Sequence, residues 1–154
     1  MPRQVSEASL REYQELVAFL DLHVTHVVRM PPSIPFHAVA ERVVADMGMS
    51  KALSGLRLGV QDSLQHFDHC TPEQLASLDA LLRARGIVSV SELRRRYSRR
   101  YRGVLKRGVI RSEEEYYLVK SILDDRWEAL SEEEQVQLGS WLLAFEKRAA
   151  DAKQ

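Results

Sequence analysis

The sequence has few of the features that mark secreted or membrane-spanning proteins. Its 154 residues include a single cysteine, Cys70. A lone thiol cannot form a stabilising disulfide within the chain, as is usual in a reducing compartment. No apolar run approaches the roughly 20 residues that a membrane-spanning helix needs, and the first residues include no apolar signal segment. We therefore expect a cytoplasmic protein with no membrane partner.

Motifs for catalysis are also lacking. The chain contains neither a glycine-rich phosphate loop nor a nucleophile elbow. Asp62, Ser63 and His66 lie close together in sequence, but nothing supplies the remaining geometry of a catalytic triad. Cys70 directly follows His69, and sequence neighbours on a helix do not face each other, so an activated thiol is not indicated. We expect no enzymatic activity and no cofactor.

Two histidine pairs leave a metal site as an alternative. His23 and His26 are three residues apart, as are His66 and His69, and residues at this spacing share a helix face. Four imidazoles from two facing helices could bind a transition metal. However, the ligand patterns of zinc sites and of di-iron bundles are absent. The default expectation is that these histidines lie on polar helix surfaces.

What the sequence does contain is a regular set of helix signals. Apolar residues recur at helical spacing along most of the chain, and glycines follow several of these stretches as stop signals. Serine or threonine followed three residues later by Glu or Gln marks a capping box. Such boxes begin at Ser9, Thr71, Ser89, Ser112 and Ser131. These signals predict an all-α fold, a single domain over residues 1–154 with about six helices and loose termini at 1–8 and 148–154.

Small residues line one side of the helix predicted between Ser50 and Phe67. Gly55 and Gly59 are four residues apart, with Ala52 and Ser63 on the same stripe. Glycine lowers helix stability, so two glycines on one face indicate that another part of the structure comes close. Tight packing inside the protein is the preferred interpretation, and a homodimer contact is the alternative.

Charge is strongly segregated, although the chain as a whole is neutral. Residues 83–111 hold 11 basic groups and one acid, Glu92, a net charge of +10. Residues 112–146 hold 10 acidic and 2 basic groups, a net charge of −8. A basic segment followed directly by an acidic one is the main physical feature of this sequence.

The basic segment predicts one amphipathic helix over residues 90–107. One side would carry apolar groups that include Tyr97 and Tyr101, and the other side would be cationic. Several cations on one rigid face suit phosphate binding. The predicted polyanion-binding residues are Arg95, Arg96, Arg99, Arg100, Arg102, Lys106, Arg107 and Arg111.

The first functional hypothesis is a small regulatory or accessory protein that binds DNA, RNA or another polyanion. The helices over residues 71–85 and 90–107 would form a helix-turn-helix pair, with any base reading from the start of the second helix. Tyr97 and Tyr101 would add base stacking or sugar contacts.

The alternative hypothesis is that the basic segment pairs with carboxylates of this chain or of an acidic protein partner. The acidic run Glu113-Glu114-Glu115, with Asp124 and Asp125, follows directly in sequence. This predicts a protein–protein interaction or self-assembling helical module without a nucleic-acid role. The two hypotheses differ on whether residues 113–125 cover the basic face or leave it open to solvent.

Overall fold

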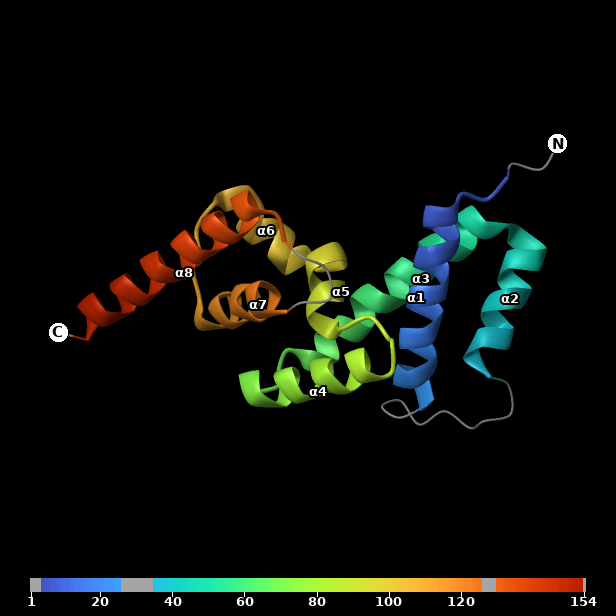
Figure 1. Ribbon diagram of the computed structural model, residues 1–154, viewed down its shortest axis with the longest axis horizontal. Coiled ribbons are helices and arrows are strands. Elements are labelled where there is room, and N and C mark those ends of the chain that lie inside the picture. Colours follow the sequence, from blue (N-terminus) through green and yellow to red (C-terminus); the bar gives the residue numbers. More distant parts are fainter. Residues whose placement is uncertain (1–3, 26–34, 126–129, 154) are drawn as a thin grey trace. The chain divides into compact units, whose positions relative to one another are not determined.

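The computed structural model describes residues 4–25, 35–125 and 130–153, which consist of helices joined by short connections (Figure 1). The all-α prediction is confirmed, and the described ranges contain no strand, but they hold eight α-helices where about six were predicted. The contacts divide the chain into two compact units, residues 1–65 and 66–154. Each unit buries apolar side chains of its own.

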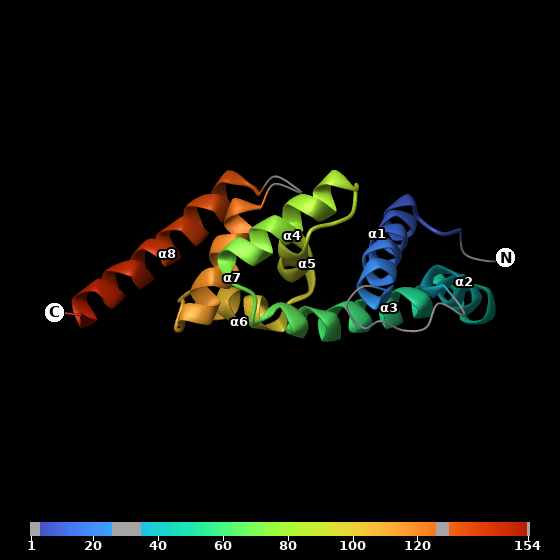
Figure 2. The same cartoon turned by 90° about the horizontal axis from the view of Figure 1, so that it is seen from below.

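The first unit contains three α-helices, which are labelled in Figure 2. These are α1 (Glu7–His23), α2 (Phe36–Met47) and α3 (Met49–Leu64). A Cβ atom on Gly59 would lie 3.6 Å from Leu20 Cδ1 of α1, so the predicted close approach occurs at this glycine. Gly55 is exposed, and a Cβ atom there would meet no neighbouring helix within 4 Å. The packing interpretation therefore holds for only one of the two glycines.

The second unit contains the basic and acidic segments. A short 3-10 turn, η2 (Gln65–Phe67), leads into α4 (Pro72–Ala84). The remaining helices are α5 (Val90–Tyr97), α6 (Arg99–Arg107), α7 (Glu113–Asp124) and α8 (Glu132–Ala152). Helices α6, α7 and α8 share an apolar core formed by Tyr101, Val104, Ile110, Leu118, Val119, Ile122, Leu130, Leu138 and Leu142.

Most of the predicted start and stop signals act as helix ends. Thr71 and Gln74 form a complete capping box at α4. Ser89, Ser112 and Ser131 each accept a hydrogen bond from the N–H three residues on. Gly86 and Gly108 have φ values of 69° and 73°, which residues with a Cβ atom rarely adopt. These glycines therefore explain the sharp turns after α4 and α6.

The predicted loose termini are wrong for residues 7–8 and 148–152, which are helical. Helix α1 begins at Glu7, because Ser6 caps it by accepting a hydrogen bond from the N–H of Ser9; Ser9 is not the cap. At the other end, α8 includes residues 148–152. Three of these five residues are alanine, and alanine has the highest intrinsic helix propensity.

The prediction of one continuous helix over residues 90–107 is also wrong. The helix breaks at Ser98, whose φ and ψ of −68° and 122° are extended. The N–H of Ser98 donates to the Arg94 carbonyl and ends α5, while its hydroxyl accepts from the N–H of Tyr101 and begins α6. Serine hydroxyls compete with helix backbone groups and favour cap positions, so the break follows from this single residue.

One member of the predicted histidine pairs, His26, lies outside the described residues. Among the helices that are described, none combines the length and the apolar character that crossing a membrane requires.

Candidate polyanion-binding surface

The start of α5 is anchored by a buried carboxylate from α4. The N–H of Val90 donates to Asp79 Oδ1 at 2.8 Å, and the hydroxyl of Ser91 donates to Asp79 Oδ2 at 2.5 Å. Asp79 is 5% exposed and Ser91 is fully buried. Burial raises the pKa of Asp79, while the hydrogen bonds from Ser91 and Val90 act against this rise. The joint between α4 and α5 is therefore held by buried hydrogen bonds.

The buried start of α5 contradicts the hypothesis that the second helix of the predicted helix-turn-helix pair reads bases with its first residues. A recognition helix must place its N-terminal side chains against base edges in the major groove. The first five residues of α5, from Val90 to Arg94, are all buried. The sequence pattern resembles a helix-turn-helix, but its reading end faces the interior of the unit.

The predicted tyrosine contacts are also wrong. Tyr97 is 7% exposed and Tyr101 is 2% exposed, and both lie in the apolar interior. Burial raises the pKa of Tyr101 to about 12. A base can stack only on an aromatic face that solvent can reach, so these rings serve packing.

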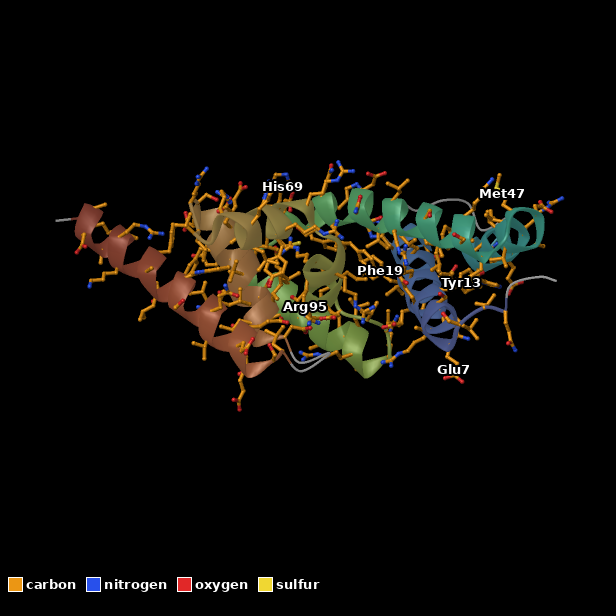
Figure 3. All side chains as sticks on the ribbon, turned by 90° about the horizontal axis from the view of Figure 1, so that it is seen from above. Glu7, Tyr13, Phe19, Met47, His69 and Arg95 are labelled. Carbon is orange, nitrogen blue, oxygen red and sulfur yellow. The ribbon has the colours of Figure 1, made fainter. Side chains whose placement is uncertain are left out.

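The two half-buried arginines of α5 are paired with carboxylates of the same unit. Glu92, 2% exposed, accepts hydrogen bonds from Arg95 Nη1 and Arg96 Nε, each at 3.0 Å. Arg95 also lies 3.6 Å from Glu134 of α8, and Figure 3 shows its position beside α5. These guanidinium groups therefore already have carboxylate partners within the unit and are a quarter exposed or less.

One flank of α6 is covered by the acidic start of α7. Arg100 Nη1 lies 3.0 Å from Glu114, and Arg107 Nη2 donates to Glu115 at 2.5 Å. The backbone N–H of Arg111 also donates to Glu115, at 2.8 Å. Burial would raise the pKa of Glu115, but the hydrogen bonds from Arg111 and Arg107 lower it overall. The acidic segment therefore covers part of the basic face, as the alternative hypothesis requires.

The opposite flank of α6 remains open to solvent. Arg99, Arg102 and Lys106 are exposed, and their spacing of three and four residues places them on one helix face. This face points away from the buried side chains of Tyr101 and Val104. We call these three cations the open row. None of them forms an ion pair within the part of the chain that the structure describes.

Arg102 shows how the open row is oriented. Its Nη2 donates to the backbone carbonyl of Arg96 at 3.1 Å, across the break at Ser98. A carbonyl fixes the position of the guanidinium without removing its charge. Arg102 is therefore held on the surface as a cation.

The predicted set of eight residues thus separates into four paired arginines, the three cations of the open row, and Arg111. Arg95, Arg96, Arg100 and Arg107 have carboxylate partners within the unit. The open row has none among the described residues, and Arg111 is exposed but lies near Glu115 and lowers its pKa. The helical spacing could have separated the two groups in α6, because Arg100 and Arg107 are seven residues apart and lie on a different flank from the open row.

Asp79 is the important residue that the sequence interpretation did not single out. It lies four residues after Leu75 and three before Leu82, both buried, so it occupies the core-facing stripe of α4. An acidic residue at an apolar position of a helix is a signal for a buried hydrogen-bonding role.

The histidines do not form a metal site within the described residues. His23 is 4% exposed and stacks on Phe19 with ring centroids 5.9 Å apart, so the expectation of a surface position is wrong for this residue. His66 and His69 are exposed. In residues 4–25, 35–125 and 130–153, no group of three or more His, Cys, Asp or Glu side chains could hold a metal ion.

The fold and this surface define an all-helical protein with a short exposed row of cations. Comparison of the chain with protein-family models, with curated proteins and with solved structures finds no match. Any function must therefore be argued from the geometry of the side chains.

Proposed function

We propose that this protein is a small accessory protein that binds the phosphate backbone of nucleic acid, without base reading, through the open row. The observation that carries the proposal is the difference between the two flanks of α6. Arg100 and Arg107 are neutralised by α7, whereas the open row is exposed and has no carboxylate partner in the described part of the chain.

The dimensions of the open row suit a charged backbone. Arg99 and Lys106 are separated by seven helical residues, about 10 Å along the axis. Duplex DNA presents one phosphate charge per roughly 1.7 Å of its axis, so three cations on this span can contact three phosphates. Arginine also presents a planar set of donors that matches phosphate oxygens.

Binding through this surface has no structural basis for sequence preference. The side chains that a helix-turn-helix would direct at bases are buried, and contacts to phosphate carry no sequence information. Affinity should therefore depend on the number of phosphates and on salt. DNA and RNA of equal length should compete for the same protein.

The test is a titration of a short labelled duplex of random sequence at increasing salt. With three phosphate contacts, the affinity should fall about fortyfold between 50 and 200 mM salt, on the counterion-release slope of about −0.9 per contact. The variant Arg99→Ala/Arg102→Ala/Lys106→Ala should lose this salt dependence and most of the binding.

A matched control removes the same charge from elsewhere on the surface. Arg42, Lys51 and Lys153 are exposed and lie outside α6, so the variant R42A/K51A/K153A should bind as the native chain does. Equal losses in both triple variants, or no binding of the native chain at low salt, would refute the proposed function.

A further inference from the structure

Helix α8 has a second, unpartnered face. Its buried side is formed by Leu138 and Leu142. On the opposite side, Val136 is 72% exposed and Leu143 is 68% exposed. These are the two most exposed large apolar side chains of the described residues, and at seven residues apart they lie on one stripe of the helix.

This stripe continues with charge at both ends. Glu132 precedes Val136 by four residues and Lys147 follows Leu143 by four residues, so all four lie on the same face. Glu132 and Lys147 are exposed, and neither forms an ion pair within the described residues. Between the two apolar side chains the stripe passes through Gly139 and Ser140.

The stripe has a twofold pattern centred between Gly139 and Ser140. Val136 and Leu143 are equally far from this centre, at about 5 Å along the axis, and Glu132 and Lys147 are equally far, at about 11 Å. Two copies of α8 placed antiparallel about this centre would bring each Val136 against the Leu143 of the other copy. The same arrangement would bring each Glu132 against an oppositely charged Lys147.

We infer that α8 is an antiparallel self-association surface, and that its occupant is α8 of a second copy of this chain. The charge inversion about the centre favours the chain itself over another partner, because a twofold contact must be self-complementary. The small residues at the centre allow the two backbones to come close. Figures 1 and 2 both show the C-terminal end of α8 extending past α6 and α7.

The contact predicts a reversible dimer. Each copy contributes two large apolar side chains, fewer than interfaces of standard size provide, and contacts of this kind are usually weak. The association should therefore be seen by sedimentation equilibrium of the full chain as a mass that rises with concentration. This surface is separate from the open row, so the dimer and the proposed nucleic-acid binding can fail independently.

The apolar part is tested by Leu143→Glu, which should raise the dissociation constant more than about tenfold, since two leucines are lost per dimer. Leu81 of α4 is 60% exposed and is the matched control, because Leu81→Glu changes an equally exposed leucine on another helix. A native chain that stays monomeric at high concentration overturns the inference. So does association that Leu81→Glu disrupts and Leu143→Glu does not.

The register is tested by exchanging charges. Glu132→Lys or Lys147→Glu alone should weaken the dimer by about threefold or more, because each change affects two symmetric pairs. The double variant E132K/K147E should restore the native dissociation constant, since the pairs are reformed with their signs reversed. Additive weakening in the double variant would contradict the antiparallel pairing.

Cross-linking separates antiparallel from parallel contact. In a Cys70→Ser background, Ser140→Cys should form an intermolecular disulfide, because position 140 lies next to the twofold centre. Val136→Cys should not, since the two cysteines would be about 10 Å apart along the axes. Equal cross-linking at both positions would indicate parallel helices and overturn the proposed arrangement.

Discussion

Helices α5 and α6 have similar arginine content, and the structure uses them in different ways. In α5, Arg95 and Arg96 are only a quarter or less exposed and pair with a buried carboxylate. In α6, the open row faces solvent and only one flank is paired. The density of positive charge along the sequence is therefore a poor guide to which cations a ligand can reach.

Three of the four carboxylates that pair with these arginines share one position in their own helices. Glu92, Glu115 and Glu134 are each the third residue after a serine that caps a helix. At this position a glutamate can bond back to the cap and complete a capping box. In this protein the three carboxylates contact arginines instead. One residue type at one local position thus neutralises much of the basic segment.

The largest expected effect concerns the anchor of α5. Asp79→Ala would leave the buried N–H of Val90 and the hydroxyl of Ser91 without their acceptor. We expect a loss of about 3 kcal/mol in the free energy of unfolding, since each unsatisfied buried group costs about 1–3 kcal/mol. Urea unfolding followed by circular dichroism measures it.

Asp79→Asn is the control for this anchor. Its amide keeps one acceptor for the Val90 N–H, so the loss should be smaller than for alanine. If Asp79→Ala unfolds at the same urea concentration as the native chain, the polar contacts at the joint of α4 and α5 do not stabilise the fold.

The next largest effect is expected from breaking the ion pairs of Arg95 and Arg96 in α5. It tests whether pairing keeps these two arginines from contacting phosphate. Glu92→Gln removes the buried charge that holds Arg95 and Arg96. We expect a loss of about 2 kcal/mol in stability, because breaking a buried ion pair leaves uncompensated charge. The freed arginines should also steepen the salt dependence of nucleic-acid binding by up to about two contacts. An unchanged slope would show that pairing is not what keeps these arginines from phosphates.

The break between the two helices should have a smaller effect. Ser98→Ala removes the hydroxyl that accepts from the N–H of Tyr101, and loss of such a cap costs about 1 kcal/mol. Ser98→Asp should retain the cap and most of the stability. Equal unfolding midpoints for the alanine variant and the native chain would show that the cap does not determine where α6 begins.

The smallest expected effect is a difference between Glu115 and Asp79 in how their contributions to stability depend on pH. The pKa of Glu115 is lowered from 4.5 in the folded chain, so its contribution to stability is present above pH 4.5 and is lost as the pH falls through the folded pKa. The stability difference between the native chain and Glu115→Gln should therefore shrink on acidification.

The anchor of α5 should behave in the opposite way. The pKa of Asp79 is raised from 3.8, so its contribution is full below pH 3.8 and decreases as the pH rises through the folded pKa. Urea unfolding at several pH values, with Glu115→Gln and Asp79→Asn compared against the native chain, should show slopes of opposite sign. Slopes of the same sign would contradict the burial of Asp79.

Much of the helical architecture could be read from local signals. Thr71 with Gln74, and the serines before α5, α7 and α8, mark helix starts because a cap acts on backbone groups three residues away. Gly86 and Gly108 mark helix ends because the turn needs a positive φ. The break at Ser98 was missed because the apolar spacing on both sides continues in phase, and only the conformation of one serine interrupts it.

The sequence predicted which cations belong to the basic segment, but it did not predict which of them are exposed and which are paired with carboxylates. The eight cations could be named from the basic segment, but local spacing does not show that Glu114 and Glu134 reach arginines of other helices. Nor does it show that the first turn of α5 is buried against α4. Ion pairs between helices depend on how those helices pack, and packing is set by contacts between residues distant in sequence.

The amino-acid sequence by itself determined that this protein is helical, where most of its helices begin and end, and that its charges are segregated, because caps, turns and periodicity act over a few residues. Only the tertiary structure decided which arginines are neutralised, that Tyr97 and Tyr101 serve the core, and that Arg99, Arg102 and Lys106 stay open to solvent. The physical reason is that a charge is satisfied or left exposed by whichever carboxylate the fold brings within reach, and that distance is a property of the packed helices.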